Sequence, residues 1–168
     1  MSSPEAEAYQ IARSLDANYI LVIFGGMSNY SGDDISKFLW MVRIAAGVYP
    51  KIKENNYYNR GHYRIDKDAS PTMKKSLMFR LCYYRFGEVR TRGDQPSGYD
   101  TVRNVEVGLK NYDLEYFREA YTSERWIVRI YEVLPLSNRD KKMKTRMVAG
   151  TEPPALKDGH GSSKFVLN

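Results

Sequence analysis

The chain has 168 residues, of which 42% are hydrophobic and 27% charged, so it is long enough for one domain with a real core and too short for two comfortable ones. Its formal net charge is +6, but residues 139–168 hold seven basic and three acidic side chains, so most of the positive charge lies at the C-terminal end. The net charge is therefore weak support for a nucleic-acid-binding fold. A single cysteine excludes an internal disulfide, and no apolar run reaches the ~18–20 residues that a membrane span needs.

The N-terminal half is predicted to alternate between helix and strand. Ser3 and Pro4 are a cap and first-turn signal, and the apolar spacing that follows predicts a first helix. Residues 19–24 are apolar at every position, which is typical of a central strand covered on both faces. Gly25-Gly26 ends this run, and a second helix is expected over residues 33–46, with Asp33 as its cap. Its core-facing residues are Ile35, Phe38, Leu39, Val42 and Ala46.

The middle of the chain is predicted to hold one further helix. One helical turn is expected within residues 51–59, and a small strand within residues 61–66. Ser70 and Pro71 then form a second cap and first-turn signal. The apolar face of the helix that follows consists of Met73, Leu77, Met78, Leu81 and Cys82.

Three more segments complete the predicted domain of residues 1–138. Residues 87–100 are expected to form a loop, residues 114–120 a short helix, and residues 126–133 a strand rich in β-branched and aromatic side chains. The order of elements predicts an α/β fold with helices packed on a small sheet around a buried central strand, with a mixed α+β arrangement as the alternative. Residues 139–168, where apolar side chains are sparse, are expected to be a basic disordered tail.

Asp34, Lys37 and Met41 stand at i, i+3 and i+7 of the predicted second helix and form one stripe along it. The stripe begins in the first turn, directly after a loop rich in Gly and Ser, and flanks the core-facing residues. It places the opposite charges of Asp34 and Lys37 and the polarisable thioether of Met41 together at the start of a helix. From spacing alone, the simpler interpretation is favoured, in which Asp34 and Lys37 form a surface ion pair worth about 0.3 kcal/mol and Met41 lies in the core.

Other catalytic and binding chemistries find little support. The spacing around Gly25-Gly26 fits neither the dinucleotide-binding nor the Walker pattern, so a plain turn is favoured. The two histidines, His62 and His160, are far apart, and no cluster has zinc or EF-hand spacing, so no metal site is expected in this chain. Cys82 lies on an apolar helix face and is expected to be a buried core thiol rather than a nucleophile.

A group of basic and aromatic residues offers an alternative function from another class. The group consists of Lys74, Lys75, Arg80, Tyr83, Tyr84 and Arg85. Tyrosine rings that stack on bases, together with cations that contact phosphates, would suit a stand-alone basic module that binds nucleic acid or an acidic surface. A solvated helix face beside core tyrosines is the favoured interpretation.

Several long, irregular strings of the sequence resemble the catalytic subunit of eukaryotic oligosaccharyltransferase. They are YILVIFGG at 19–26, YSGDDISKFLWMVRI at 30–44, YRID at 63–66, CYYRFG at 82–87, GYD at 98–100, VRN at 102–104 and YTSERWIVRIY at 121–131. The resemblance covers about residues 2–139 and leaves out the tail. The chain looks like a large part of the C-terminal lumenal domain of that subunit.

The resemblance implies a function and a location. The family transfers an oligosaccharide from a dolichyl pyrophosphate carrier to the Asn of Asn-x-Ser/Thr sequons, at the lumenal side of the endoplasmic reticulum membrane. Its Asp-x-x-Lys-x-x-x-Met motif maps onto Asp34, Lys37 and Met41, and in the family this helix helps to form the pocket for the hydroxyl residue of the sequon. Met41 suits a contact with a threonine methyl group, and Lys37 and Asp34 suit the polar wall of the pocket.

The chain also departs from the family pattern. It has no Trp-Trp-Asp motif, since Trp40 and Trp126 are isolated. The family's carboxylates that bind Mg²⁺ or Mn²⁺ lie upstream, in the membrane portion, so the resemblance implies that this chain holds no catalytic residue and no metal and is inactive alone. The implied partners are the acceptor polypeptide, the dolichyl-linked oligosaccharide, other subunits of the complex and the upstream transmembrane portion, with no nucleic acid.

Asn29 begins a sequon of its own, Asn-Tyr-Ser at 29–31, directly before the stripe. In a lumenal protein such a sequon could be glycosylated. An unmodified surface turn is the favoured alternative.

Overall fold

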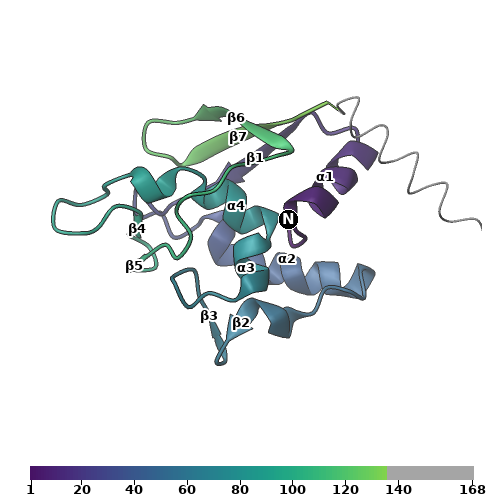
Figure 1. Ribbon diagram of the computed structural model, residues 1–168, viewed down its shortest axis with the longest axis horizontal. Helices are drawn as coiled ribbons and strands as arrows, with labels where there is room; N and C mark the ends of the chain where they lie inside the picture. The colour runs from purple at the N-terminus through teal and green to yellow at the C-terminus, as the bar shows by residue number, and fades with distance from the viewer. Residues whose placement is uncertain (136–168) are drawn as a thin grey trace, which may run out of the picture. The chain divides into compact units, whose positions relative to one another are not determined.

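Three antiparallel strands form the main sheet of the computed structural model, which describes residues 1–135 (Figure 1). The strands are β1 (Tyr19–Ile23), β6 (Phe117–Thr122) and β7 (Val128–Val133), in the order β1-β7-β6. Two short antiparallel ribbons are formed by β2 (Tyr58–Asn59) with β3 (His62–Tyr63) and by β4 (Tyr99–Asp100) with β5 (Val105–Glu106). The helices are α1 (Glu5–Ser14), α2 (Asp34–Val48), α3 (Pro71–Lys75) and α4 (Leu77–Tyr83), with 3-10 turns η1 (Glu54–Tyr57) and η2 (Phe86–Glu88). The predicted mixed α/β class is confirmed.

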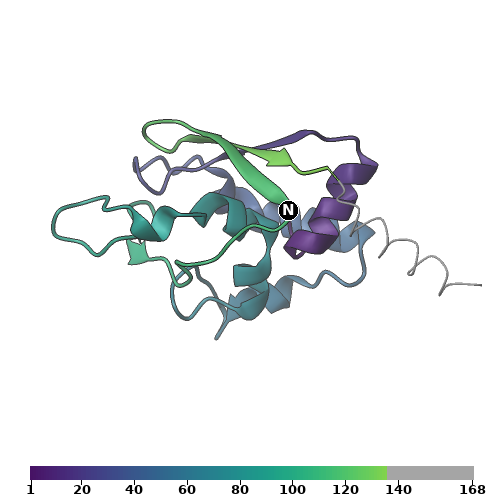
Figure 2. The ribbon, with the colours of Figure 1, turned by 45° about the horizontal axis from the view of Figure 1, so that its top comes forward.

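The helices lie against one face of the main sheet (Figure 2). Helix α4 is central, because it contacts β1 and β7 above it and α1, α2 and α3 around it. The core beside it is aromatic: the ring of Phe24 meets those of Tyr83 and Phe86 edge to face, with centroids 5.2 and 5.0 Å apart. Such pairs stabilise a fold by about 0.5–1.5 kcal/mol each beyond the area that they bury.

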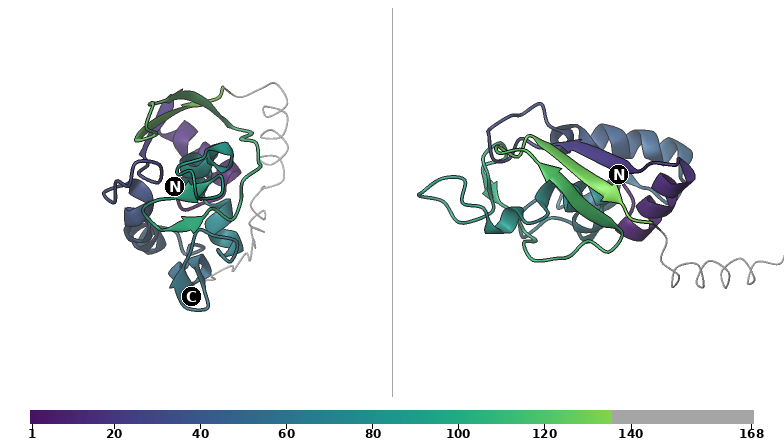
Figure 3. Two further views of the ribbon diagram at one scale, coloured as in Figure 1. Left: turned by 90° about the vertical axis from the view of Figure 1, so that its left-hand side faces the viewer. Right: turned by 90° about the horizontal axis from the view of Figure 1, so that it is seen from above.

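No described helix covers the opposite face of the sheet, which the view from above shows (Figure 3, right). Along β1, Val22 is fully buried, whereas Tyr19 and Leu21 are 61% and 54% exposed. Within the described sheet β1 is an edge strand and β7 is the central one. The prediction of a central, doubly covered strand at residues 19–24 is therefore wrong for the part of the chain described. An apolar run alone does not distinguish a covered face from an exposed apolar one.

The short helix expected over residues 114–120 is also wrong, because β6 occupies most of this segment. Phe117 is buried against α1, where its ring meets that of Tyr9. Arg118 is exposed and forms a cross-strand ion pair with Glu132 of β7. The segment contains good helix formers, but pairing with β7 decides its conformation, since tertiary contacts commonly override weak propensities.

The helix predicted to begin at Ser70 is divided in two at Ser76. Ser70 caps α3, its Oγ accepting a hydrogen bond from the Met73 amide at 3.1 Å, and Pro71 takes the first helical position, both as predicted. Ser76 ends α3 and caps α4, its Oγ accepting from the Phe79 amide at 3.3 Å. The predicted apolar face nevertheless survives the break, because all five of its residues are buried.

The N-terminal segment docks at this break. The Leu77 amide donates to the Ser3 carbonyl at 2.9 Å, and Pro4 forms a bridge with Ser76. Ser3 therefore does not cap α1, whose N-cap is Pro4 without a side-chain hydrogen bond. The helix predicted over residues 33–46 and the helical turn predicted within residues 51–59 are confirmed as α2 and η1. The strands predicted within residues 61–66 and over residues 126–133 are confirmed as β3 and β7. The predicted tail from residue 139 lies outside the described residues.

Arg129 of β7 is a fully buried arginine that holds the end of α4. Its guanidinium donates at 2.8–3.0 Å to three main-chain carbonyls, those of Leu81, Cys82 and Tyr84. It also donates to Glu119 at 3.1 Å and lies 4.3 Å from the centre of the Trp126 ring. The last carbonyls of a helix lack partners within it, so one buried cation satisfies them and joins α4 to the sheet.

Candidate functional site

Two adjacent carboxylates fasten the start of α2 to the end of β1. Asp33 is the fully buried N-cap of α2 and accepts hydrogen bonds from the amide and hydroxyl of Ser36, at 3.1 and 2.7 Å. The other oxygen of Asp33 accepts from the Gly25 amide at 2.9 Å, and Asp34 accepts from the Ile23 amide at 2.8 Å. Asp33 is thus the expected cap, while Asp34 fills a hydrogen-bonding position on the open edge of β1.

Gly25 is required by the close approach of the loop that joins β1 to α2. A Cβ atom at this position would lie 1.8 Å from the Tyr30 carbonyl oxygen, which no rotamer change can relieve because that oxygen belongs to the main chain. The Tyr30 amide in turn donates to the Gly25 carbonyl at 3.2 Å. The two glycines therefore form a tight turn, as the sequence predicts, and the turn brings Asp33 back to the end of β1.

Lys37 is exposed and turns back toward the start of α2. Its ammonium donates to the Gly32 carbonyl at 2.8 Å. Among the described residues it forms no salt bridge with Asp34, whose carboxylate is engaged by β1 instead. The surface ion pair that spacing alone favours is therefore not the arrangement found. Lys37 presents its positive charge at the edge of the loop before α2.

Met41 lies at the boundary between the core and solvent, one turn further along α2, and is partly exposed. The sequence predicts this boundary position for the stripe, and the structure confirms it. The neighbouring outer face of α2 is apolar and consists of Trp40, Ile44 and Val48, which are 65%, 72% and 67% exposed. Sequence reasoning did not single out this face, although the spacing of the three residues, at i, i+4 and i+8, is that of one helix face.

Arg103 contacts the first turn of α2 and joins two buried carboxylates. Its guanidinium forms an ion pair with Asp33 and another with Asp100 at 2.9 Å, and donates to the Ser36 hydroxyl at 2.8 Å. Asp33 and Asp100 are fully buried. Burial alone would lower the pKa of Arg103, but the negative charges around it raise that pKa, so the guanidinium stays a cation. Asp100 also accepts from the hydroxyl of Tyr83 at 2.7 Å, and burial raises the pKa of Tyr83, so this hydroxyl remains a donor.

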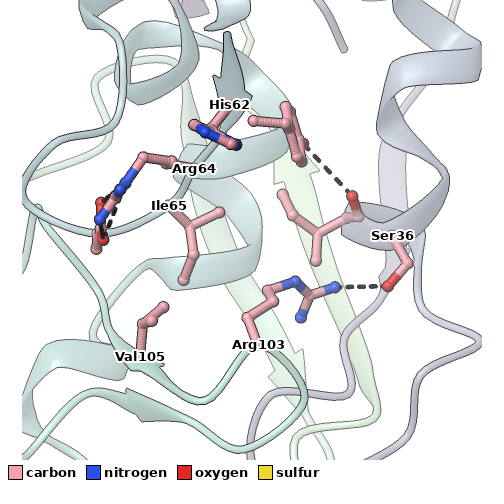
Figure 4. Close-up of a pocket in the computed structure, with 9 residues that line it drawn as sticks. Ser36, His62, Arg64, Ile65, Arg103 and Val105 are labelled. Atoms are coloured by element: carbon pink, nitrogen blue, oxygen red, sulfur yellow. Dashed lines mark hydrogen bonds and ion pairs between the residues drawn. The ribbon is translucent and has the colours of Figure 1, made fainter. Parts of the chain in front are cut away.

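A pocket of about 590 Å³ lies beside this cluster, between the start of α2 and β3 (Figure 4). Its lining includes Tyr63, Arg64 and Arg103, with His62, Ile65 and Val105. Arg64 is paired with Asp66, and hydrogen bonding by Arg64 lowers the pKa of that carboxyl. Both arginines of the pocket therefore already have carboxylate partners, and the pocket offers little unbalanced charge to an anion.

Neither a metal site nor a reactive thiol occurs among residues 1–135. No group of three or more His, Cys, Asp or Glu side chains in this part of the chain is arranged to hold a metal ion. Cys82 is fully buried in α4, and burial raises the pKa of its thiol, which fits the predicted inert core residue. The binding of Mg²⁺ or Mn²⁺ outside this chain, which the resemblance implies, stays a prediction.

Asn29 is exposed in the loop before α2 and has a left-handed backbone, with φ of 59°. Its main-chain amide donates to the hydroxyl of Thr101 at 3.0 Å, which joins this loop to the segment that carries Arg103. The glycosylation of Asn29 stays a prediction, and the intact mass of the native protein would decide it.

The basic and aromatic group of the alternative function is not arranged as a nucleic-acid surface. Tyr83 is fully buried, so its ring is not available for stacking. Arg80 is paired with Glu5 at 3.1 Å and stacks on Tyr112 at 5.1 Å. Lys74 is turned onto the carbonyl of Lys67. The favoured interpretation, a helix face beside core tyrosines, fits these contacts better.

No protein-family model matches the chain, but curated relatives do. It is 60% identical over 139 residues to the dolichyl-diphosphooligosaccharide–protein glycosyltransferase subunit STT3B of Oryza sativa subsp. japonica. It is 59% identical over 139 residues to STT3B of Arabidopsis thaliana and 56% identical over 138 residues to STT3 of Dictyostelium discoideum. This chain matches one segment of the STT3 subunit. The alignments cover 82–83% of the chain and 19% of each relative, so the chain spans about a fifth of the length of these STT3 proteins.

The match agrees with the resemblance read from the sequence strings. Those strings contain Asp33, Asp100, Arg103 and Arg129, although sequence reasoning gave a role to none of them beyond the cap at Asp33. In the described part of the STT3-like segment the longest helix is α2, with 15 residues, and no helix there has the length and apolar character that crossing a bilayer requires.

Proposed function

We propose that this chain is part of the catalytic subunit of oligosaccharyltransferase and that α2 helps to recognise the acceptor sequon. The complete enzyme moves an oligosaccharide from dolichyl pyrophosphate to the Asn of Asn-x-Ser/Thr, at the lumenal side of the endoplasmic reticulum membrane. Its partners are the acceptor polypeptide, the lipid-linked donor and the other subunits. The bond-making groups and their Mg²⁺ or Mn²⁺ lie elsewhere in the full-length protein, so the isolated chain has no transferase activity.

One observation carries this proposal: the 60% identity over 139 residues to an STT3B subunit named as a glycosyltransferase. Identity at this level over most of a chain supports a common fold and a common role for the segment. The place of α2 within that role rests on its Asp34, Lys37 and Met41, which match the family's motif. Their arrangement supports it, because Lys37 and Met41 are both accessible and lie one turn apart.

The two accessible side chains offer complementary contacts to a hydroxyl residue. The ammonium of Lys37 is a charged donor suited to an oxygen of the acceptor. Met41 offers a flexible, polarisable thioether to a methyl group, which threonine has and serine lacks. Asp34 serves both indirectly, because it fixes the first turn of α2 on β1. The segment therefore contributes affinity and some preference for threonine.

The replacement Met41→Ala in the full-length enzyme tests this proposal. We expect KM for an Asn-x-Thr peptide to rise about fivefold relative to that for an Asn-x-Ser peptide, because the loss of one methyl contact costs about 1 kcal/mol. Ile44→Ala, a change of similar size on the exposed apolar face of α2, is the matched control and should change both peptides alike. An equal effect of Met41→Ala on the two peptides would contradict a methyl contact.

A further inference from the structure

Arg103 reaches α2 from a segment far away in the sequence. It belongs to the turn between β4 and β5, and its side chain extends along the pocket toward Ser36 of α2 (Figure 4). It contacts Asp33 and Ser36 in the first turn of α2 and Asp100 at the end of β4. The start of α2 is thus held from one side by β1 and from the other side by Arg103.

The contacts form a chain that leads to Lys37. Arg103 holds the carboxylate of Asp33, and Asp33 holds the Gly25 amide and the first turn of α2. The residue before Asp33 is Gly32, whose carbonyl accepts the ammonium of Lys37. A shift of the Asp33 carboxylate would therefore move the Gly32 carbonyl, which accepts the hydrogen bond of Lys37. This coupling requires no contact between Arg103 and Lys37 themselves.

Both carboxylates depend on this one cation. Asp33 and Asp100 are fully buried, and the Arg103 side chain is 15% exposed. Without the guanidinium, two buried negative charges would lose their counter-ion, which strongly favours rearrangement or protonation of at least one of them. Asp100 is held by the Tyr83 hydroxyl and by the amides of residues 102 and 103. Asp33 is held by the Gly25 amide and by the amide and hydroxyl of Ser36, so a rearrangement of its carboxylate would move the turn that it caps.

We propose that Arg103 is a positioning residue for acceptor recognition, which acts through Asp33 to set the placement of Lys37 on α2. This inference rests on the proposed function of α2. A lysine would replace it only in part, because its single ammonium does not reproduce the planar fork that engages Asp33, Asp100 and Ser36 together. The role is distinct from contact with the acceptor, since the guanidinium of Arg103 is already engaged by Asp33, Asp100 and Ser36.

The test uses the full-length subunit in its assembled complex, with a sequon peptide and a lipid-linked oligosaccharide. For Arg103→Gln we expect the acceptor KM to rise about tenfold, because displacement of a binding group by about 1 Å costs up to about 100-fold. KM for the donor and kcat should change less than about threefold, because the groups that bind the donor are not moved. Arg103→Lys should fall between the wild type and Arg103→Gln.

Arg80→Gln is the matched control. Arg80 is similarly covered, with 22% of its side chain exposed, and is paired with the buried Glu5, but it forms no hydrogen bond or ion pair with α2 among the described residues. It should lower thermal stability comparably and leave the acceptor KM unchanged. An acceptor KM that rises equally in both variants, or a kcat that falls while KM stays constant, would overturn the positioning role.

Two further variants keep the outcomes separable. Ser36→Ala removes one bond of Arg103 and the hydroxyl bond to Asp33, both within the proposed network, without removing a charge. It should raise the acceptor KM about twofold even if Arg103→Gln fails to assemble, and an unchanged KM in Ser36→Ala would then count against the inference. If Lys37→Ala raises the acceptor KM and Arg103→Gln does not, the inference about Arg103 fails alone. If Lys37→Ala itself leaves the acceptor KM unchanged, the proposed function of α2 fails.

Discussion

Two arginines hold helix ends in this protein, and they do so by different means. Arg129 is fully buried and donates directly to three carbonyls at the C-terminal end of α4. Arg103 lies at the rim of a pocket and holds the N-terminal end of α2 through the carboxylate of Asp33. A helix C-terminus attracts a cation directly, whereas a helix N-terminus accepts one only through an intervening anion.

The two arginines therefore affect different properties, the stability of the domain and the position of α2. The partners of Arg129 belong to α4 and to the strands of the main sheet, so its loss would disturb the core of the domain. The partners of Arg103 belong to α2 and to the β4–β5 ribbon, which lie at the edge of the core and carry the candidate site. Arg129 therefore supports the fold as a whole, and Arg103 sets the position of one functional element within it.

The largest expected effect is that of Arg129→Gln on stability. The change leaves the buried carbonyls without their charged donor and removes the buried cation that pairs with Glu119. We expect the free energy of unfolding to fall by about 3–5 kcal/mol, as for other broken buried pairs. Arg118→Gln on the neighbouring strand removes an exposed ion pair and should lose less than about 1 kcal/mol. Arg103→Gln should lie between these two in urea unfolding. A smaller loss for Arg129→Gln than for Arg103→Gln would break the comparison.

Two glycine replacements compare how tightly the chain is packed before the start of α2 and near its end. Gly25→Ala places a Cβ atom against the Tyr30 carbonyl and should destabilise the protein by about 2–3 kcal/mol. Gly47→Ala, near the other end of α2, meets no atom within 4 Å and should stabilise it by about 0.5–1 kcal/mol. Thermal unfolding measures both. A tolerated Gly25→Ala would show that the loop before α2 is not held as tightly as the contacts of Asp33 indicate.

The smallest expected effect is a pH dependence at Glu119, the carboxylate partner of Arg129. Burial alone would raise its pKa, but a hydrogen bond from Thr122 and the charge of Arg129 lower that pKa below its usual value. A lowered pKa in the folded state contributes stability that is present above the unfolded pKa of about 4.3 and is lost as the pH falls through the folded value.

The replacement Glu119→Gln tests this dependence. At pH 7 the unchanged chain should exceed Glu119→Gln in its free energy of unfolding by about 1 kcal/mol, a typical contribution for such a hydrogen bond. The difference should shrink as the pH falls below about 4, which urea unfolding at several pH values would measure. A difference that grows in acid would reverse the assigned sign.

Local signals predicted much of the fold. The cap at Ser70, the cap at Asp33 and the buried face that includes Cys82 follow from residue type and spacing, and the structure confirms them. The errors lie where distant segments decide. Residues 117–122 form a strand because they pair with β7, and β1 pairs with β7 alone in the described sheet, facts that no local pattern of residues 114–120 or 19–24 records.

The candidate site was predictable in part. The stripe of Asp34, Lys37 and Met41 was visible from helical spacing and from the family's motif, and α2 presents it at the predicted boundary. The roles of Arg103 and Arg129 were not visible, because most of the acceptors of each lie 45 or more residues away in the sequence. A buried arginine has no sequence signature of its own, since its charge suggests the surface.

The acceptor KM of Lys37→Ala in the full-length, assembled enzyme tests most directly whether α2 recognises the sequon. The loss of a charged hydrogen-bond donor should raise this KM by about tenfold, equivalent to about 1.4 kcal/mol, while the affinity for the lipid-linked oligosaccharide stays unchanged. Lys51→Ala, which removes a lysine just beyond the end of α2, serves as the control for the change in net charge. An unchanged acceptor KM, or a loss of donor binding in Lys37→Ala, would contradict a role of α2 in acceptor recognition.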